Sequence, residues 1–198
     1  MPESSPTVAR RTTLHKGRKF DFELVTTEVA PGRTLTREVV RHPGAVLILP
    51  VLPDGRIVLI RNRRIAVDAW LYELPAGTLE PGEDPADCAR RELEEETGYR
   101  AQRMDPLVTF YTTPGLTDEK MRAFVATGLT SVGQALEEDE NIEVHPTPIP
   151  DVLAMIDRGE LVDGKSILAL LLALRRGLLR EAGSGAAGGG GGGGEGER

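Results

Sequence analysis

The sequence predicts an α/β sandwich, and three observations lead to that fold class. Short strand-like segments bounded by turn residues recur from residue 20 to residue 147. Segments with helical signals are interspersed among them, which is the order expected when helices cover the faces of a sheet. The chain has 198 residues, 39% of them hydrophobic, which suits one domain with an appendage.

Strand signals divide the first two thirds of the chain. Residues 1–13 are polar and are predicted to be disordered. Turns at Pro31-Gly32 and Pro53-Asp54-Gly55 each join two strand-like runs, and residues 45–51 are nearly all apolar, as in a buried strand. The predicted strands are residues 20–29, 34–41, 45–51, 56–61, 70–73, 107–111, 121–127 and 142–147.

Helix signals are strongest in the middle of the chain. Asp84 is a suitable N-cap, Pro85 is tolerated at the first helical position, and Gly98 suits a left-handed C-terminal cap. Two further helices are predicted, residues 152–158 capped by Asp151 and residues 166–181. Residues 183–198 are nearly all glycine and are predicted to be disordered, because they offer no apolar surface to offset the entropy of ordering.

Composition excludes several classes of protein. The net charge of −7 argues against a general nucleic-acid binder, and the single cysteine, Cys88, rules out an intramolecular disulfide. The longest apolar run, residues 167–174, is too short to span a bilayer, so no membrane partner is expected. The polar start shows no secretory signal, and a soluble cytoplasmic protein is therefore expected.

The central predicted helix ends in a cluster of carboxylates. At about 3.6 residues per turn, Glu92, Glu95 and Glu96 project on one side of it. Carboxylates are unfavourable near a helix C-terminus, and like charges three or four residues apart repel. One interpretation is a solvated acidic face. The other is a site for a divalent cation such as Mg²⁺ or Mn²⁺, which prefer such oxygen ligands.

The residues around this cluster resemble a known family. From Gly77 to Tyr99 the chain reads GTLEPGEDPADCARRELEEETGY. Its glycines, its Arg-Glu-Leu and Glu-Glu elements and their spacing are similar to the Nudix box. In that family the box is a loop, helix, loop unit that binds divalent cations and cleaves a nucleoside diphosphate linked to another group. The resemblance implies a Nudix-type α/β/α sandwich with a mixed sheet, here with a small N-terminal β-subdomain.

The flanking residues resemble the ADP-ribose pyrophosphatase branch of the family. Residues 73–77 look like its entry into the box, and Pro114 stands where that branch carries a proline. This resemblance implies that Glu83 pairs with Arg91 and holds the loop on the helix. It also implies a set of metal ligands, with Glu95 supporting a further ion: the carbonyl of Ala76 and the carboxylates of Glu92 and Glu96.

The same branch takes its general base from an acidic loop outside the box. The matching segment here is residues 137–140, in which Glu138 aligns with the base and Glu140 with an additional metal ligand. A solvated acidic loop is the alternative interpretation of this segment.

Substrate contacts are implied by position. Arg64 is the candidate contact to phosphate or base, and Glu73 is expected on the ribose or adenine side. Gly115 and Leu116 are expected to line the terminal ribose. Asn62-Arg63 replaces a glutamine and an aromatic residue that the branch usually carries before the arginine.

The expected activity is divalent-metal-dependent hydrolysis of ADP-ribose to AMP and ribose 5-phosphate. The alternatives are hydrolysis of GDP-mannose or another nucleoside diphosphate sugar, and a non-catalytic sensor that binds ADP-ribose. A sensor would be expected to have a degraded box and a DNA-binding domain. Residues 44–182 are predicted as the Nudix domain. Residues 1–43 are predicted as strands that pack on a partner chain in a homodimer, and the resemblance implies that they help to build the partner's adenine site.

Overall fold

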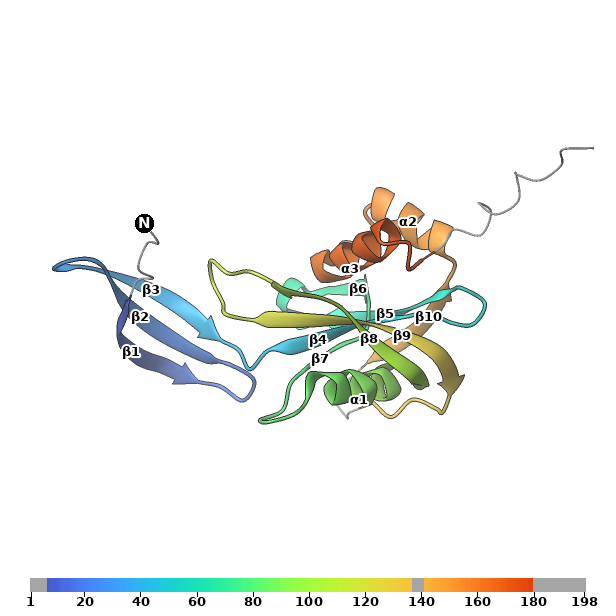
Figure 1. Ribbon diagram of the computed structural model, residues 1–198, viewed down its shortest axis with the longest axis horizontal. Coiled ribbons are helices and arrows are strands. Elements are labelled where there is room, and N and C mark those ends of the chain that lie inside the picture. Colours follow the sequence, from blue (N-terminus) through green and yellow to red (C-terminus); the bar gives the residue numbers. More distant parts are fainter. Residues whose placement is uncertain (1–6, 137–140, 180–198) are drawn as a thin grey trace, which may run out of the picture.

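The computed structural model describes residues 7–136 and 141–179. Two sheets, one of them mixed, lie between one helix on one side, α1 (Pro85–Thr97), and two on the other, α2 (Ile149–Asp157) and α3 (Gly164–Arg175) (Figure 1). A separate N-terminal sheet extends from one end of this sandwich. The α/β/α arrangement with an N-terminal β-subdomain is therefore confirmed. None of the described helices is both long and apolar enough to cross a membrane.

The strands form three sheets. β1–β2–β3 is antiparallel, β10–β5–β6 is antiparallel, and β7–β4–β9–β8 contains the parallel pair β4–β9. Their bounds are β1 (Thr7–Lys16), β2 (Asp21–Ala30), β3 (Arg33–Arg41), β4 (Ala45–Pro50), β5 (Ile57–Arg64), β6 (Ala69–Glu73), β7 (Ala76–Thr78), β8 (Tyr99–Tyr111), β9 (Lys120–Ser131) and β10 (Ile142–Thr147).

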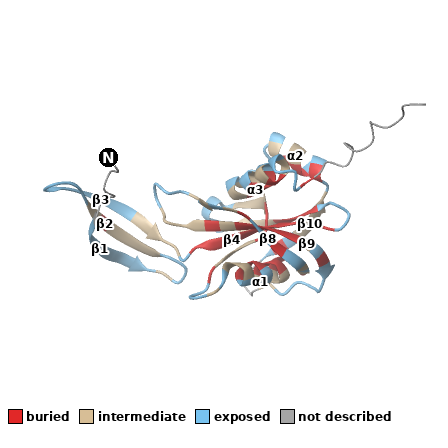
Figure 2. Cartoon of the chain, in the orientation of Figure 1, coloured by how far each residue is buried: buried red, intermediate tan, exposed pale blue. Residues whose placement is uncertain are grey.

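Strand β4 shows why a continuous apolar run is needed at the centre of the sandwich. Every residue of β4 is buried, and successive side chains point to opposite faces of a strand. Leu47 and Leu49 pack in the core shared with α2 and α3, whereas Val46 and Ile48 pack in the core shared with α1. Figure 2 shows this burial concentrated in the sandwich.

The N-terminal sheet has almost no core of its own. Val25 is its only buried hydrophobic residue among those described. Residues 7–13 were expected to be disordered, but they lie in β1, which pairs with β2 along its length. The expectation was wrong because β1 is stabilised by pairing with a strand that follows it and not by burial, so its side chains carry no apolar pattern. Residues 1–6 and 183–198 lie outside the described residues.

The boundaries of two helices differ from the prediction. α2 begins at Ile149 after Pro148, so that Asp151 lies in its first turn and is not its N-cap. α3 begins after Asp163, whose side chain accepts a hydrogen bond from the backbone N–H of Ser166, and it ends at Arg175. Gly177 follows with a φ of 67°, a left-handed conformation that ends a helix readily. The leucine-rich pattern continues past this glycine, so the predicted helix was too long.

The N-terminal sheet is joined to the sandwich by ion pairs and backbone hydrogen bonds. Arg41 contacts Glu23 of β2 at 2.9 Å and Asp118, in the loop before β9, at 2.5 Å. The backbone N–H of Val40 donates to the carbonyl of Leu116 in that loop (3.0 Å). Arg41 therefore fixes the orientation of the sheet relative to the loop that follows β8.

Candidate active site

Helix α1 has the ends that the sequence predicts. The Asp84 side chain accepts a hydrogen bond from the backbone N–H of Ala86, and Gly98 has a φ of 71°. One face of α1 buries Ala89 and Leu93 against the sheet. Glu92 and Glu96 are also buried, although carboxylates rarely are without partners.

The loop before α1 is built around the two buried carboxylates. A Cβ on Gly77 would lie 1.9 Å from Oε1 of Glu92, so only glycine leaves room for that carboxylate. The backbone N–H of Ala76 donates to Oε2 of Glu96 at 2.9 Å. Strand β7, which the sequence did not predict, thus holds its backbone directly against the carboxylates of α1.

Arg91 connects the loop and the helix. Its guanidinium contacts Glu83 at 3.1 Å, Glu92 at 2.8 Å and Glu95 at 3.0 Å. Hydrogen bonds from Arg91 lower the pKa of Glu83 to about 2. Glu83 therefore stays ionised above that pH. The stability that the pairing contributes is present above the unfolded pKa and is lost as the pH falls through about 2.

Cys88 is poorly suited to act as a nucleophile. It is fully buried on α1, and this burial, with Glu83 nearby, raises the pKa of its thiol to about 12. A thiol with that pKa is protonated at neutral pH and is a poor nucleophile.

The donor set fits a divalent cation. Within the ranges 7–136 and 141–179, no group of three or more His, Cys, Asp or Glu side chains is arranged to hold a metal. Arg91 and the backbone N–H of Ala76 contact the carboxylates of Glu92 and Glu96. However, the hard oxygens of Glu92 and Glu96 and the glycine-tight cradle at Gly77 suit such an ion. The residues that would hold it are Glu92, Glu96, the carbonyl of Ala76 and, for a further ion, Glu95.

A second charged cluster lies beside the carboxylates. Glu73, at 1% relative exposure, accepts hydrogen bonds from Nε and Nη2 of Arg64 at 2.6 and 2.7 Å, and from Nζ of Lys165 at 2.5 Å. Burial alone would raise the pKa of Glu73, but the hydrogen bonds from Arg64 and the charge of Lys165 outweigh it and lower that pKa. Glu73 is therefore ionised, and it positions the two cations.

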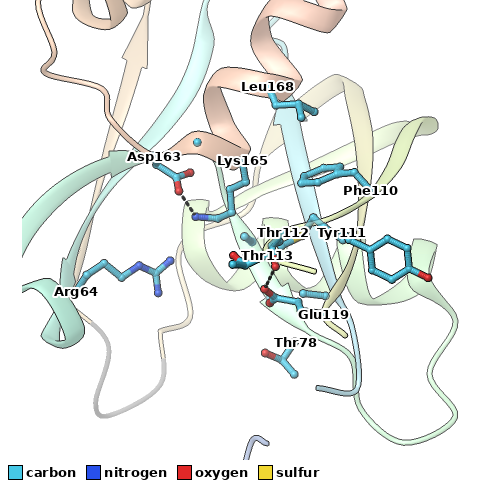
Figure 3. A pocket seen from close by; sticks show the side chains of 15 residues that line it. Arg64, Thr78, Phe110, Tyr111, Thr112, Thr113, Glu119, Asp163, Lys165 and Leu168 are labelled. Atoms are coloured by element: carbon cyan, nitrogen blue, oxygen red, sulfur yellow. Dashed lines mark hydrogen bonds and ion pairs between the residues drawn. The ribbon is translucent and has the colours of Figure 1, made fainter. Parts of the chain in front are cut away.

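Two hollows meet at this cluster. One, of about 360 Å³, is lined by Glu92, Glu95 and Glu96 together with Arg64 and residues 76–78. The other, a cleft of about 620 Å³, shares Arg64 and residues 76–78 and continues toward α3 and the end of β8. Figure 3 shows the second cleft. Together the two hollows form an acidic site with an open cleft beside it.

Side chains from distant parts of the chain face each other across the larger cleft. Arg64 and Lys165 come from β5 and α3, and Thr112, Thr113 and Glu119 come from the loop between β8 and β9 (Figure 3). The Thr112 hydroxyl donates to Glu119 at 2.6 Å. Of these residues, Arg64 was predicted as a substrate contact, and Glu119 is the next candidate for the general base if Glu138 does not serve. The other three were not among the predicted site residues.

Several predicted positions lie elsewhere. Gly115 and Leu116 do not line either hollow, and Leu116 is 52% exposed in the loop that contacts β3. Asn62 lines the acidic hollow, whereas Arg63 pairs with Asp68. The predicted base and extra ligand, Glu138 and Glu140, lie outside the described residues.

Comparisons with known proteins identify the family of the chain. The model of the NUDIX domain family matches residues 41–170. The ADP-ribose pyrophosphatase of Bacillus subtilis (strain 168) is 37% identical over 159 residues, which cover 79% of this chain and 86% of that protein. A protein named methanol dehydrogenase activator, from Bacillus methanolicus, has the same identity and the same coverage.

Two further comparisons concern another relative and a solved structure. The GDP-mannose pyrophosphatase of Yersinia enterocolitica serotype O:8 is 32% identical over 171 residues, covering 82% of this chain and 89% of that protein. A solved structure described as an ADP compounds hydrolase superposes with a TM-score of 0.76 at 25% identity, covering 88% of this chain and 95% of that one. The chain belongs to the NUDIX domain family and is a pyrophosphohydrolase of that family.

Proposed function

We propose that this chain hydrolyses ADP-ribose to AMP and ribose 5-phosphate, with Mg²⁺ as its cation and Mn²⁺ as a possible replacement. The observation that carries the proposal is the acidic hollow on α1, joined at Arg64 to a second cleft. A diphosphate that links two bulky groups needs a site where its negative charge is neutralised. It also needs open space beside that site for the two groups. The relative named ADP-ribose pyrophosphatase supports the choice of substrate.

The reaction adds water across one P–O bond of the diphosphate. The water oxygen bonds to one phosphorus, the bridging oxygen leaves with the other phosphate, and a proton passes to a base. Divalent ions held by Glu92, Glu96 and the Ala76 carbonyl would supply charge neutralisation and Lewis-acid activation when bound. Arg91 fixes the carboxylates by its hydrogen bonds, and Arg64, held by Glu73, contacts a phosphate where the two hollows meet.

Glu138 is the proposed general base, and Glu140 the proposed additional metal ligand. A base outside α1 is needed because a carboxylate bound to metal is a poor proton acceptor. Glu138→Gln is expected to lower kcat by about 10²–10⁴-fold and to leave KM and metal affinity nearly unchanged. Glu140→Gln is expected to raise the Mg²⁺ concentration needed for activity. Steady-state kinetics combined with Mg²⁺ titrations measure both, and swapped phenotypes would show that the two roles are reversed.

A panel of substrates tests the proposed specificity. ADP-ribose, GDP-mannose and other nucleoside diphosphate sugars are compared by kcat/KM with Mg²⁺ present, and the products are identified chromatographically. The proposal expects the highest kcat/KM for ADP-ribose. No cleavage of any diphosphate sugar would contradict the enzyme assignment.

Hydrolysis of GDP-mannose is the second candidate. Two observations favour it: the relative named GDP-mannose pyrophosphatase, and Arg63, which stands where the ADP-ribose branch carries an aromatic residue and which is paired with Asp68. A strong preference for GDP-mannose in the same panel would replace the substrate and leave the reaction class unchanged.

We also propose that the chain forms a homodimer through residues 1–43. The N-terminal sheet exposes several large apolar side chains that it cannot cover itself: Val8, Leu14, Phe20, Val29 and Leu35. A single-layer sheet of this kind is rarely stable alone, because an apolar face needs a partner. Analytical ultracentrifugation should find a dimer at micromolar concentration. A monomer there, or full activity after deletion of residues 1–43, would contradict this proposal.

A further inference from the structure

The short connection between β6 and β7 is held by hydrogen bonds to three different elements. The backbone N–H of Leu74 donates to Oγ of Ser166 in α3 at 2.8 Å. The carbonyl of Pro75 accepts from the N–H of Ile48 in β4 at 2.9 Å, and the N–H of Ala76 donates to a carboxylate of α1 at 2.9 Å. The backbone that lies against the acidic hollow is therefore linked, within two residues, to a helix on the other side of the sandwich (Figure 1).

Ser166 is completely buried, and its hydroxyl group is used in both directions. Oγ donates to Oδ2 of Asp163 at 2.5 Å and accepts from Leu74. The same Oδ2 atom accepts the backbone N–H of Ser166 at 3.1 Å, which makes Asp163 the N-cap of α3. Because a hydroxyl has a single proton, its bond to Asp163 leaves a lone pair of Oγ for the N–H of Leu74. The cap of α3 and the hydrogen bond to Leu74 thus form one unit.

A second contact from the same turn of α3 holds the neighbouring residue. Nζ of Lys165 lies 2.5 Å from Oε2 of Glu73, the last residue of β6, and 2.9 Å from Oδ1 of Asp163. Figure 3 shows the ion pair between Asp163 and Lys165 at the larger cleft. The first turn of α3 therefore holds Glu73 through its side chain and Leu74 through its backbone.

We propose that Ser166 is a positioning residue of the active site, which acts through Leu74 on Ala76. The inference rests on the proposed function and gives Ser166 no contact with the substrate. Pro75 lies between Leu74 and Ala76, and its ring fixes one of the backbone dihedral angles of the connection. A shift of the Leu74 peptide is therefore carried on to Ala76, whose backbone faces Glu96 and would supply its carbonyl to a divalent ion.

Ser166→Ala tests this role by removing only the hydroxyl. The buried N–H of Leu74 then loses the oxygen that accepts its proton, which favours movement of the connection. A displacement of about 1 Å in a catalytic group can cost roughly 10²-fold in rate, so kcat with ADP-ribose should fall by about 10–100-fold, and KM should change less. The Kd for Mn²⁺ of the substrate-free protein, measured by titration calorimetry, should rise by about tenfold, as for other groups that orient metal ligands. Normal kcat and normal Mn²⁺ affinity would overturn the inference.

Two further variants separate positioning from a loss of stability. Ser166→Thr keeps the hydroxyl and should retain kcat and Mn²⁺ affinity near the wild-type values. Ala173→Gly is the matched control, because it lowers the stability of the same helix at a fully buried position about two turns from Ser166. The control should lower the temperature of thermal unfolding and leave kcat and the Kd for Mn²⁺ unchanged when both are measured well below that temperature. Equal losses of kcat in Ala173→Gly and Ser166→Ala would overturn the inference.

Amide hydrogen exchange reports on the connection without turnover. In Ser166→Ala the amide protons of Leu74 and Ala76 should exchange about tenfold faster than in the wild type, because local opening becomes easier. In Ser166→Thr they should stay protected. If the extra methyl group of threonine breaks the hydrogen bond instead, exchange and kcat should change together, as in Ser166→Ala. Protected amides in Ser166→Thr combined with a kcat as low as that of Ser166→Ala would overturn the inference.

The two measurements without substrate also separate this inference from the proposed function. If the wild type cleaves no diphosphate sugar, the proposed function fails. The Mn²⁺ titrations and the exchange rates then still decide whether Ser166 places Ala76. Unchanged Mn²⁺ affinity together with unchanged exchange in Ser166→Ala would show that it does not.

Discussion

Replacing Glu92 or Glu96 by glutamine is expected to lower turnover by about 10²–10⁴-fold, while the fold persists. Glutamine keeps the shape of the side chain and removes the charge on which cation binding depends, and a bound ion stabilises the transition state by several kcal/mol. Stability without metal should hold or rise slightly, because like-charge repulsion and the unfavourable helix dipole are both reduced. Steady-state kinetics at saturating Mg²⁺ and thermal unfolding in its absence measure the two effects.

Glu94→Gln is the matched control for these variants. Glu94 lies on the same helix, but its carboxylate pairs with Arg100 on the exposed side at 2.8 Å, away from the acidic hollow. The Glu94→Gln variant should keep near-normal turnover, because an exposed ion pair contributes little to stability. If Glu92→Gln and Glu96→Gln behave like this control, the metal site does not lie on α1.

Gly77→Ala is expected to have a comparably large effect through geometry alone. The added Cβ would lie 1.8 Å from Cδ of Glu92, so either the carboxylate or β7 has to move. Overpacking of this kind costs about 1–3 kcal/mol of stability, and a displacement of about 1 Å in a catalytic group can cost roughly 10²-fold in rate. The temperature of thermal unfolding and the value of kcat/KM should both fall.

Gly115→Ala adds the same methyl group where no atom lies within 4 Å, in a backbone conformation that alanine can adopt. It should change stability and kcat/KM little. Normal activity of Gly77→Ala would mean that the position of Glu92 against β7 is unimportant for the reaction.

Helix α1 could be predicted from sequence because its signals are local. Asp84, Pro85 and Gly98 mark its ends within the segment itself, and the spacing of Glu92 and Glu96 fixes their common face. The buried strand β4 could be predicted for the same reason, since its apolar run is continuous. The fold class and the acidic part of the site therefore followed from short stretches of sequence.

Other parts depend on contacts between distant residues. Lys165 lies 92 residues from Glu73, with which it pairs, and nothing near Lys165 in the sequence indicates that partner. Arg18, between β1 and β2, lines the acidic hollow although it lies far from Glu92 in the sequence. Strand β7 has three residues, too few to show a period, and it exists through pairing with β4. Such features are set by tertiary packing, which local patterns do not encode.

Product analysis of ADP-ribose hydrolysis, with and without an excess of chelator, tests most directly whether the carboxylates of α1 support cation-dependent cleavage of a diphosphate. The account predicts AMP and ribose 5-phosphate as the only products when Mg²⁺ is present, no cleavage with chelator, and recovery when Mg²⁺ is restored. Cleavage that persists in chelator at the same rate would contradict it.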